Sequence, residues 1–76
     1  MIVDARGHRC PVPSLRLRKA LHGAAPETRV TLLATDPMAR IDVPHLMQEL
    51  GGRVIEVRED AGGLAITVES GAGSEG

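Results

Sequence analysis

The most reactive side chain in this sequence is that of Cys10, the only cysteine among 76 residues. Because it has no partner in the chain, it cannot form an internal disulfide. It lies in the run Arg9-Cys10-Pro11-Val12-Pro13, in which two prolines restrict the backbone around the sulfur. A free thiol at such a position can act as a nucleophile once it ionises.

Several features of this run would lower the pKa of the thiol. We expect Cys10 at the N-cap of a helix and Pro11 as the first helical residue, so the partial positive charge of the helix N-terminus would lie beside the sulfur. Arg9 adds a full positive charge next to it. Proline has no N–H, so the backbone donors expected nearby are those of Val12 and Ser14.

A single thiol without a placed base limits the possible reactions. Hydrolysis by a cysteine nucleophile needs a histidine base, and nothing in the spacing of His8, His22 and His45 fixes any of them near Cys10. His8 either folds back toward the sulfur or is an ordinary exposed loop histidine. Thioredoxin-type exchange needs a second cysteine. A metal site needs more soft ligands, so we expect no metal and no resident cofactor. Carrying a group between proteins remains, beside the alternative of a buried, inert cysteine.

The composition is that of one small domain. The chain has no Phe, Trp or Tyr, so its modest core must be built from smaller apolar side chains. The lack of stacking platforms and a net charge of −1 argue against nucleic-acid binding. No run approaches the roughly 20 apolar residues of a membrane span, and we expect no signal peptide. A single cysteine suits a reducing cytoplasm, and we expect a monomer.

The charges are unevenly distributed along the chain. Residues 1–29 contain six basic and two acidic side chains, whereas residues 30–76 contain three basic and eight acidic ones. Cys10 lies in the basic part. The asymmetry is either an ordinary solvated surface or a basic collar that meets an acidic partner or an anion.

Periodicity and turn residues predict two helices and four strands. In order, they are a strand at 2–5, a helix from 11 to a stop near 23, a strand at 28–35, a helix at 42–50, and strands at 53–60 and 64–69. Strands joined by helices tend to pair in parallel, and two helices cannot cover both faces of four strands. We therefore expect a two-layer α/β sandwich with a mixed four-stranded sheet and both helices on one face.

Each predicted helix has an apolar face. On the first helix this face consists of Pro13, Leu17, Ala20, Leu21 and Ala24. On the second it consists of Val43, Leu46, Met47 and Leu50. Asp42 is the expected N-cap of the second helix, with Pro44 in its first turn.

The C-terminal part is predicted as a hairpin and a tail. Ile55 and Val57 are expected on one side of the strand 53–60. The small polar residues at 70–76 predict a disordered tail, which leaves residues 1–69 as the folded domain.

Leu15 is expected on the solvent side of the first helix, with Arg18 and Lys19 beside it. Single exposed leucines are common and often have no function. The alternative is a partner-docking patch with an apolar anchor and a basic rim, which would speed encounters with an acidic partner.

A wider pattern of residues extends this interpretation. It consists of Asp4-x-Arg6-Gly7-x-x-Cys10-Pro11-x-Pro13, Arg18-Lys19, Asp36-Pro37 and Asp42-Val43-Pro44. This pattern resembles that of the TusA/SirA-like sulfur carrier (sulfurtransferase) family, and the resemblance covers residues 3–69. One departure lies near the thiol, because His8 stands where a leucine is common in the family.

The resemblance implies a β-α-β-α-β-β sandwich like the C-terminal domain of bacterial translation initiation factor three. It also implies that Cys10 accepts sulfane sulfur as a persulfide from a cysteine desulfurase or rhodanese-type donor. A downstream acceptor protein would then take the sulfur for tRNA thiolation, cofactor sulfuration or sulfur oxidation. Such a protein passes sulfur between proteins instead of turning over a free substrate. The alternative is a non-catalytic regulatory or interaction module in which Cys10 only caps a helix.

Overall fold

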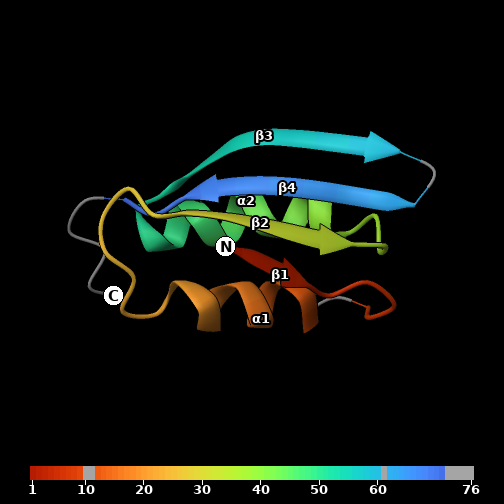
Figure 1. Cartoon of the computed structure of the whole chain (residues 1–76), viewed down its shortest axis with the longest axis horizontal. Coiled ribbons are helices and arrows are strands. Elements are labelled where there is room, and N and C mark those ends of the chain that lie inside the picture. Colours follow the sequence, from red (N-terminus) through yellow and green to blue (C-terminus); the bar gives the residue numbers. More distant parts are fainter. Residues whose placement is uncertain (10–11, 61, 72–76) are drawn as a thin grey trace.

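The structure, a computed structural model, arranges two helices and four strands in the part of the chain that it describes (Figure 1). The elements are β1 Ile2–Asp4, α1 Val12–Leu21, β2 Arg29–Ala34, α2 Ala39–Leu50, β3 Arg53–Asp60 and β4 Gly63–Glu69. The description covers residues 1–9, 12–60 and 62–71, and Cys10, Pro11, Ala61 and residues 72–76 lie outside it. Within this description, neither helix has the length and apolar character needed to cross a membrane.

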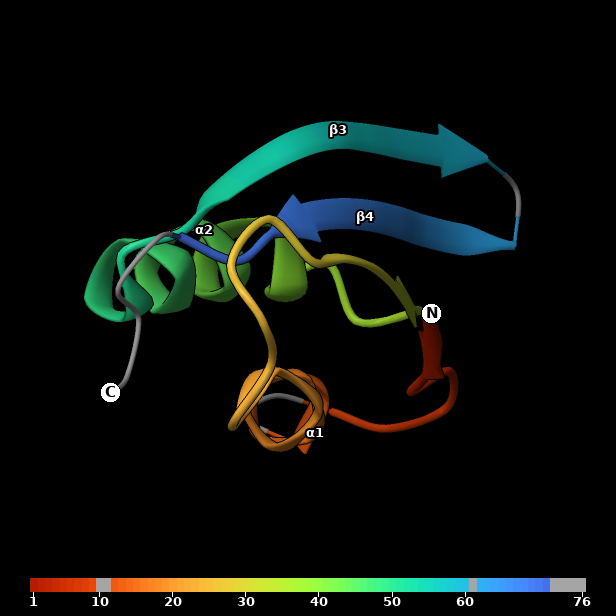
Figure 2. The ribbon, with the colours of Figure 1, turned by 60° about the vertical axis from the view of Figure 1, so that its left-hand side comes forward.

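The four strands form one mixed sheet in the order β1-β2-β4-β3. β1 and β2 are joined by α1 and pair in parallel, as expected for strands linked through a helix. β4 lies between β2 and β3 and pairs antiparallel with both. Both helices cover the same face of the sheet (Figure 1 and Figure 2). The predicted two-layer sandwich with β-α-β-α-β-β order is confirmed.

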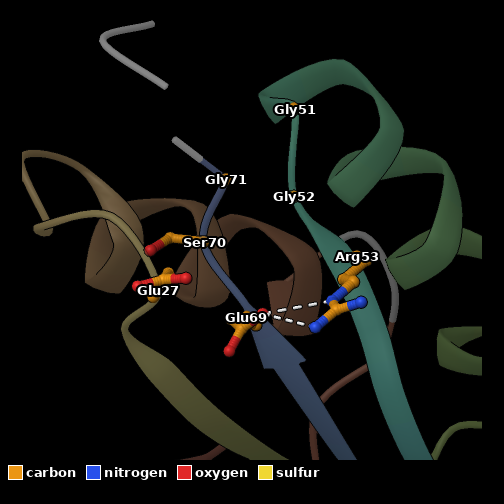
Figure 3. Close-up of a pocket in the computed structure, with 7 residues that line it drawn as sticks. All are labelled: Glu27, Gly51, Gly52, Arg53, Glu69, Ser70 and Gly71. Carbon is orange, nitrogen blue, oxygen red and sulfur yellow. Dashed lines mark hydrogen bonds and ion pairs between the residues drawn. The ribbon is translucent and has the colours of Figure 1, made fainter. Parts of the chain in front are cut away.

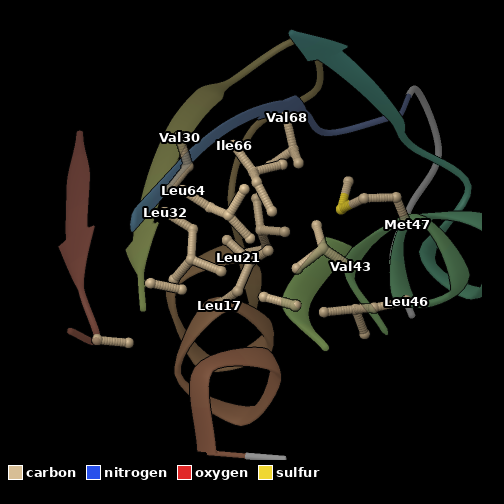
Figure 4. Close-up of a cluster of buried hydrophobic side chains, with 13 residues drawn as sticks. Leu17, Leu21, Val30, Leu32, Val43, Leu46, Met47, Leu64, Ile66 and Val68 are labelled. Carbon is tan, nitrogen blue, oxygen red and sulfur yellow. The ribbon is translucent and has the colours of Figure 1, made fainter. Parts of the chain in front are cut away.

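The core fills the space between the helices and the sheet (Figure 4). Its larger members are Leu17 and Leu21 from α1, Val43, Leu46 and Met47 from α2, and Val30, Leu32, Leu64, Ile66 and Val68 from the sheet. Full burial of one such side chain contributes roughly 1.5–3 kcal/mol. This layer of apolar contacts therefore fixes α1 and α2 against the sheet without any aromatic residue.

The apolar face of α1 is largely as predicted. Pro13, Leu17 and Leu21 are buried, whereas Ala20 is half-buried. The helix ends at Leu21, and Gly23 follows with φ +76°. That left-handed conformation is one that glycine adopts without steric cost, and it stops the helix where the sequence predicted.

α2 begins four residues earlier than the N-cap predicted at Asp42 implied. Ala39 is its first residue, so Asp42 lies in the first turn and the N-cap prediction was wrong. Met38 occupies the N-cap position, and its N–H donates to Asp36 Oδ1 at 3.0 Å. Pro44 consequently lies inside the helix, where it removes one backbone hydrogen bond. At the other end, the predicted glycine stop is present.

A β-bulge changes which side chains of β3 face the core. Val54 pairs with Val68 and Val57 pairs with Ile66, so two residues instead of one lie between Val54 and Val57. The strict alternation used to place Ile55 on the side of Val57 is therefore interrupted. The prediction that the two residues share one side stays a prediction. Val54 packs against the core, whereas Ile55 and Val57 are 38% and 40% exposed.

The folded unit extends beyond residue 69. Ser70, predicted as the first residue of the tail, is only 5% exposed. Its Oγ donates to the Ala25 carbonyl at 2.6 Å and accepts the Thr28 N–H at 2.9 Å, and its carbonyl accepts the Glu27 N–H at 3.0 Å. Ser70 is thus fixed to the α1–β2 connection. The rest of the predicted tail from residue 72 lies outside the described residues.

Candidate functional site

A hydrogen-bonded turn leads out of β1 toward Cys10. Asp4 Oδ1 accepts the Arg6 N–H at 3.1 Å and Arg6 Nε–H at 2.9 Å, and Asp4 Oδ2 accepts from Nη2 at 2.8 Å. The His8 N–H donates to the Ala5 carbonyl at 3.2 Å, and Gly7 has φ +86° between them. A type II turn requires that φ at its third residue, which explains the glycine of the Asp-x-Arg-Gly pattern.

The contact between Arg6 and Asp4 also shifts the pKa values of both side chains. The side-chain hydrogen bond from Arg6 is the main cause that lowers the pKa of Asp4 to about 2. The same bond raises the pKa of Arg6. The Arg6 guanidinium is therefore paired with the Asp4 carboxylate within the turn.

The turn is anchored to the end of β2. The Ala5 N–H donates to the Leu33 carbonyl at 2.8 Å, and the Gly7 N–H donates to Thr35 Oγ1 at 2.9 Å. Ala5 is fully buried. Thr35 was not singled out from the sequence, since a hydroxyl at a strand end gives no signal of a partner 28 residues away.

A backbone hydrogen bond joins Arg9 and Val12, the described residues on either side of positions 10 and 11. Cys10 and Pro11 lie outside the described residues, but the residues on either side are described. The Val12 N–H donates to the Arg9 carbonyl at 2.9 Å, across positions 10 and 11. The Val12 N–H thus has an acceptor in the Arg9 carbonyl. The prediction that Val12 belongs to the environment of a thiolate stays a prediction. Arg9 is exposed, and the buried Pro13 fixes the first turn of α1 in the core.

The start of α1 is electropositive. Its first turn contains no acidic side chain, so nothing there neutralises the partial positive charge of the helix N-terminus. Arg16 Nη1 donates to the Asp4 carbonyl at 3.4 Å, which brings a second guanidinium to the loop side of the helix. Arg16 was missed in the sequence, where it is one of several arginines. Ser14 Oγ is buried and has no hydrogen-bond partner among the described residues, while the role predicted for the Ser14 N–H stays a prediction.

The three residues predicted for partner docking have different environments. Leu15 is 56% exposed, as expected for a residue on the solvent side of the first helix. Arg18 Nη2 forms an ion pair with Glu49 Oε1 of α2 at 3.1 Å, so its charge is shared with the neighbouring helix. Lys19 is exposed, and no acidic side chain pairs with it in the part of the chain that the structure describes.

A shallow cavity of about 250 Å³ lies at the opposite end of the helices, where α2 ends and β3 begins (Figure 3). It is lined by Glu27, Gly51, Gly52, Arg53, Glu69, Ser70 and Gly71. Glu69 accepts hydrogen bonds from Arg53 and Arg29, and the one from Arg53 is the main cause that lowers its pKa. The Glu69 carboxylate is thus paired with two guanidinium groups. The cavity lies away from the start of α1 and is not part of the cysteine site.

Metal ligands do not cluster in the described residues. No group of three or more His, Cys, Asp and Glu side chains lies close enough there to hold an ion. The expectation that the chain works without a metal stays a prediction.

Comparison of this fold with solved structures gives the class of protein. The crystal structure of the SirA-like protein from Desulfitobacterium hafniense superposes with a TM-score of 0.79 at 33% sequence identity. The match covers 93% of this chain and 99% of that one. The chain thus has the SirA-like fold, with both helices on one face of a mixed sheet.

Sequence comparison then gives the family. The family model described as Sulfurtransferase TusA matches residues 1–70. The Sulfur carrier protein TusA of Pseudomonas paraeruginosa is 38% identical over 61 residues, which are 80% of this chain and 77% of that protein. A protein of the same name from Pseudomonas putida is 36% identical over 61 residues, 80% of this chain and 76% of that protein. The chain therefore belongs to the TusA family, and the resemblance inferred from its motifs is confirmed.

Membership in this family supports a role in sulfur relay in general. A relay implies one protein that supplies sulfur and another that takes it.

Proposed function

We propose that this protein is a sulfur carrier that holds sulfane sulfur as a persulfide on Cys10. The observation that supports this most strongly is the electropositive start of α1, two residues after Cys10 in the chain. The helix N-terminus has no acidic side chain in its first turn, and Arg9 and Arg16 add positive charge. Each of these features stabilises a thiolate relative to a thiol.

The transfer needs no external oxidant or reductant. The Cys10 thiolate attacks the outer sulfur of a donor persulfide, the donor S–S bond breaks, and a new S–S bond forms on Cys10. The donor leaves as a thiolate, and the proton released by Cys10 balances it. A thiol and a persulfide become a persulfide and a thiol, and the same step run toward a second protein delivers the sulfur.

The donor in this proposal is a cysteine desulfurase or a rhodanese-type protein, and the acceptor is a downstream protein of tRNA thiolation, cofactor sulfuration or sulfur oxidation. Leu15 and Lys19, with Arg18 bridged to Glu49, lie on the solvent side of α1. They are the side chains that we propose a partner contacts first. A monomer working in the cytoplasm belongs to the same proposal.

Mass spectrometry tests the proposal. The protein is incubated with a cysteine desulfurase carrying its pyridoxal cofactor, and with cysteine, under non-reducing conditions. We expect a gain of one sulfur atom that maps to Cys10 and is absent in Cys10→Ser. If no protein donor or sulfane compound adds sulfur, the alternative of a non-catalytic module with a capping cysteine gains support instead.

A further inference from the structure

We propose that Thr35 is a positioning residue for sulfur transfer, a role that rests on the sulfur-carrier function above and deepens it. The central contact is the hydrogen bond in which the Gly7 N–H donates to Thr35 Oγ1 at 2.9 Å. Thr35 follows the last residue of β2 and lies 28 residues from Gly7 in the chain. Its hydroxyl takes no part in the exchange of sulfur. It holds the turn at residues 5–8, which precedes Cys10 in the sequence.

The backbone on both sides of Thr35 is fixed. Ala34, which precedes it, is fully buried and is paired with β4. Asp36, which follows it, accepts two backbone N–H groups at the start of α2. Its Oδ1 accepts the Met38 N–H at 3.0 Å, and its carbonyl accepts the Ala39 N–H at 3.0 Å. Thr35 therefore presents its side chain from a part of the fold that both the sheet and α2 hold in place.

Gly63, the first residue of β4, limits the orientation of the Thr35 side chain. A β-carbon at position 63 would lie 3.2 Å from Thr35 Cα, 3.3 Å from Thr35 Cγ2 and 2.5 Å from the Ala34 carbonyl oxygen. Because glycine lacks that carbon, the Thr35 methyl group packs closely against the start of β4. Threonine is β-branched and restricted at χ1. A methyl group held against β4 therefore leaves Oγ1 in the direction in which it accepts the Gly7 N–H.

The turn that receives this hydrogen bond is tied to β2 at two points. The Ala5 N–H donates to the Leu33 carbonyl at 2.8 Å, which fixes the start of the turn. The bond from Gly7 to Thr35 fixes it two residues further on, where the backbone has φ +86°. Cys10 follows Gly7 by three residues in the sequence. The second tie therefore restrains the chain shortly before the residue that is proposed to hold the sulfur.

The expected effect of this restraint is on the rate of transfer and not on binding. In a complex of carrier and donor, the attacking sulfur must lie close to the donor S–S bond with the correct orientation. A turn released from Thr35 samples more conformations, so a smaller fraction of the bound carriers presents Cys10 for attack. The bond is exposed to solvent, and its loss removes one ordinary hydrogen bond without opening the core.

A second threonine of the same segment provides a matched control. Thr31 lies in β2, and its Oγ1 forms a hydrogen bond with Thr67 Oγ1 of β4 at 3.0 Å. Thr31→Val therefore removes a hydroxyl and its hydrogen bond, as Thr35→Val does, but leaves the contact between Thr35 and Gly7 in place. Thr35→Ser is the conservative variant, because it keeps Oγ1 as an acceptor for the Gly7 N–H.

Two measurements on Thr35→Val, Thr35→Ser and Thr31→Val test the positioning role. The first is hydrogen exchange of the Gly7 amide by NMR, which we expect to be about fivefold faster in Thr35→Val. The second is sulfur loading by a purified cysteine desulfurase. Its rate at saturation should fall about fivefold in Thr35→Val, with KM unchanged. Thr35→Ser and Thr31→Val should stay within about twofold of wild type in both measurements.

Two further measurements separate positioning from other effects. Loading by inorganic polysulfide needs no bound protein donor, so it should be unchanged in all variants. Circular dichroism verifies that each variant is folded. Thr35→Ala removes the same hydroxyl without placing a second methyl group there, and it carries the test if the valine variant does not fold.

The possible failures are distinguishable. If the desulfurase loads wild type and Thr35→Val at the same rate, or if the Gly7 amide exchanges no faster in Thr35→Val, the positioning role is overturned and the carrier function stands. A loss of rate in Thr31→Val or Thr35→Ser as large as that in Thr35→Val also overturns it, because a general loss of stability then explains the effect. Absence of loading of wild type by the desulfurase and by polysulfide overturns the proposed function and the positioning role with it.

Discussion

At the scale of single residues, Asp4 and Arg6 hold the backbone that follows β1 with three hydrogen bonds. Both side chains are more than half exposed, and exposed ion pairs contribute little to overall stability. Their effect is local, because they fix the turn in which Gly7 takes its positive φ. The Asp-x-Arg-Gly pattern is thus explained by the geometry of one turn.

The pH dependence of this turn follows from the lowered pKa of Asp4, about 2 against an ordinary value of 3.8. Because the folded-state pKa is lowered, the stabilisation is fully present above the unfolded value and is lost as the pH falls from about 4 toward 2. Titration of the Asp4 carboxyl by NMR should show its midpoint moving up toward 3.8 in Arg6→Gln. A midpoint that stays near 2 would exclude Arg6 as the cause.

Two serines should respond in opposite ways to the same substitution. Ser70→Ala leaves the Thr28 N–H and the Ala25 carbonyl without their partner, so we expect a loss of about 1–3 kcal/mol in the free energy of unfolding. Ser14→Ala removes a buried hydroxyl that has no partner among the described residues, so we expect no loss and a gain of up to about 1 kcal/mol. Chemical denaturation measures both. Equal destabilisation by the two substitutions would contradict this description of their hydrogen bonds.

At the scale of elements, the connection between α1 and β2 contains the one described non-glycine residue with positive φ. Glu27 has φ +64° and donates its N–H to the Ser70 carbonyl at 3.0 Å. Residues with a β-carbon disfavour this conformation, whereas glycine adopts it freely. The connection is therefore strained at the point where it meets the end of β4.

Relief of this strain should stabilise the protein. We expect Glu27→Gly to raise the free energy of unfolding by about 1 kcal/mol, after the larger chain entropy of glycine in the unfolded state is subtracted. Thermal or denaturant unfolding measures the change. Glu27→Ala is the control, because it removes the carboxylate and keeps the β-carbon. If the alanine variant gains as much as the glycine variant, the carboxylate and not the backbone is the cause.

Some features of the helices and strands could be predicted from the local sequence, and others could not. The apolar periodicity of Leu17 and Leu21 and the glycine after α1 were sufficient for the first helix. The start of α2 was misplaced because Asp42 looks like an N-cap, while the hydrogen bond from Met38 to Asp36 starts the helix earlier. The bulge in β3 depends on pairing with β4, so alternation within β3 alone could not predict it.

At the scale of the whole molecule, the uneven charge of the chain is partly neutralised in the fold. Arg18 and Arg29 from the basic part pair with Glu49 and Glu69 from the acidic part. Ion pairs of this kind join segments 31 and 40 residues apart. The positive charge that remains on the described surface beside α1 therefore comes from fewer residues than the sequence suggested.

Only those parts of the candidate site that depend on residues adjacent in sequence could be predicted. Cys10, Arg9 and Pro13 could be identified because the chemistry of a thiol before a helix depends on adjacent residues. The use of the Val12 N–H by Arg9 and the approach of Arg16 to Asp4 depend on how the loop folds back.

The central claim is that Cys10 both accepts and releases sulfur, and transfer of radioactive sulfur tests it most directly. The protein is loaded from labelled cysteine by a cysteine desulfurase, separated from it, and mixed with unlabelled, sulfur-free desulfurase. We predict one labelled sulfur per chain at most, released by a thiol reductant, returned to the desulfurase, and absent from Cys10→Ser. Label on Cys10→Ser equal to that on wild type, or label that never leaves the wild-type chain, would contradict the carrier function.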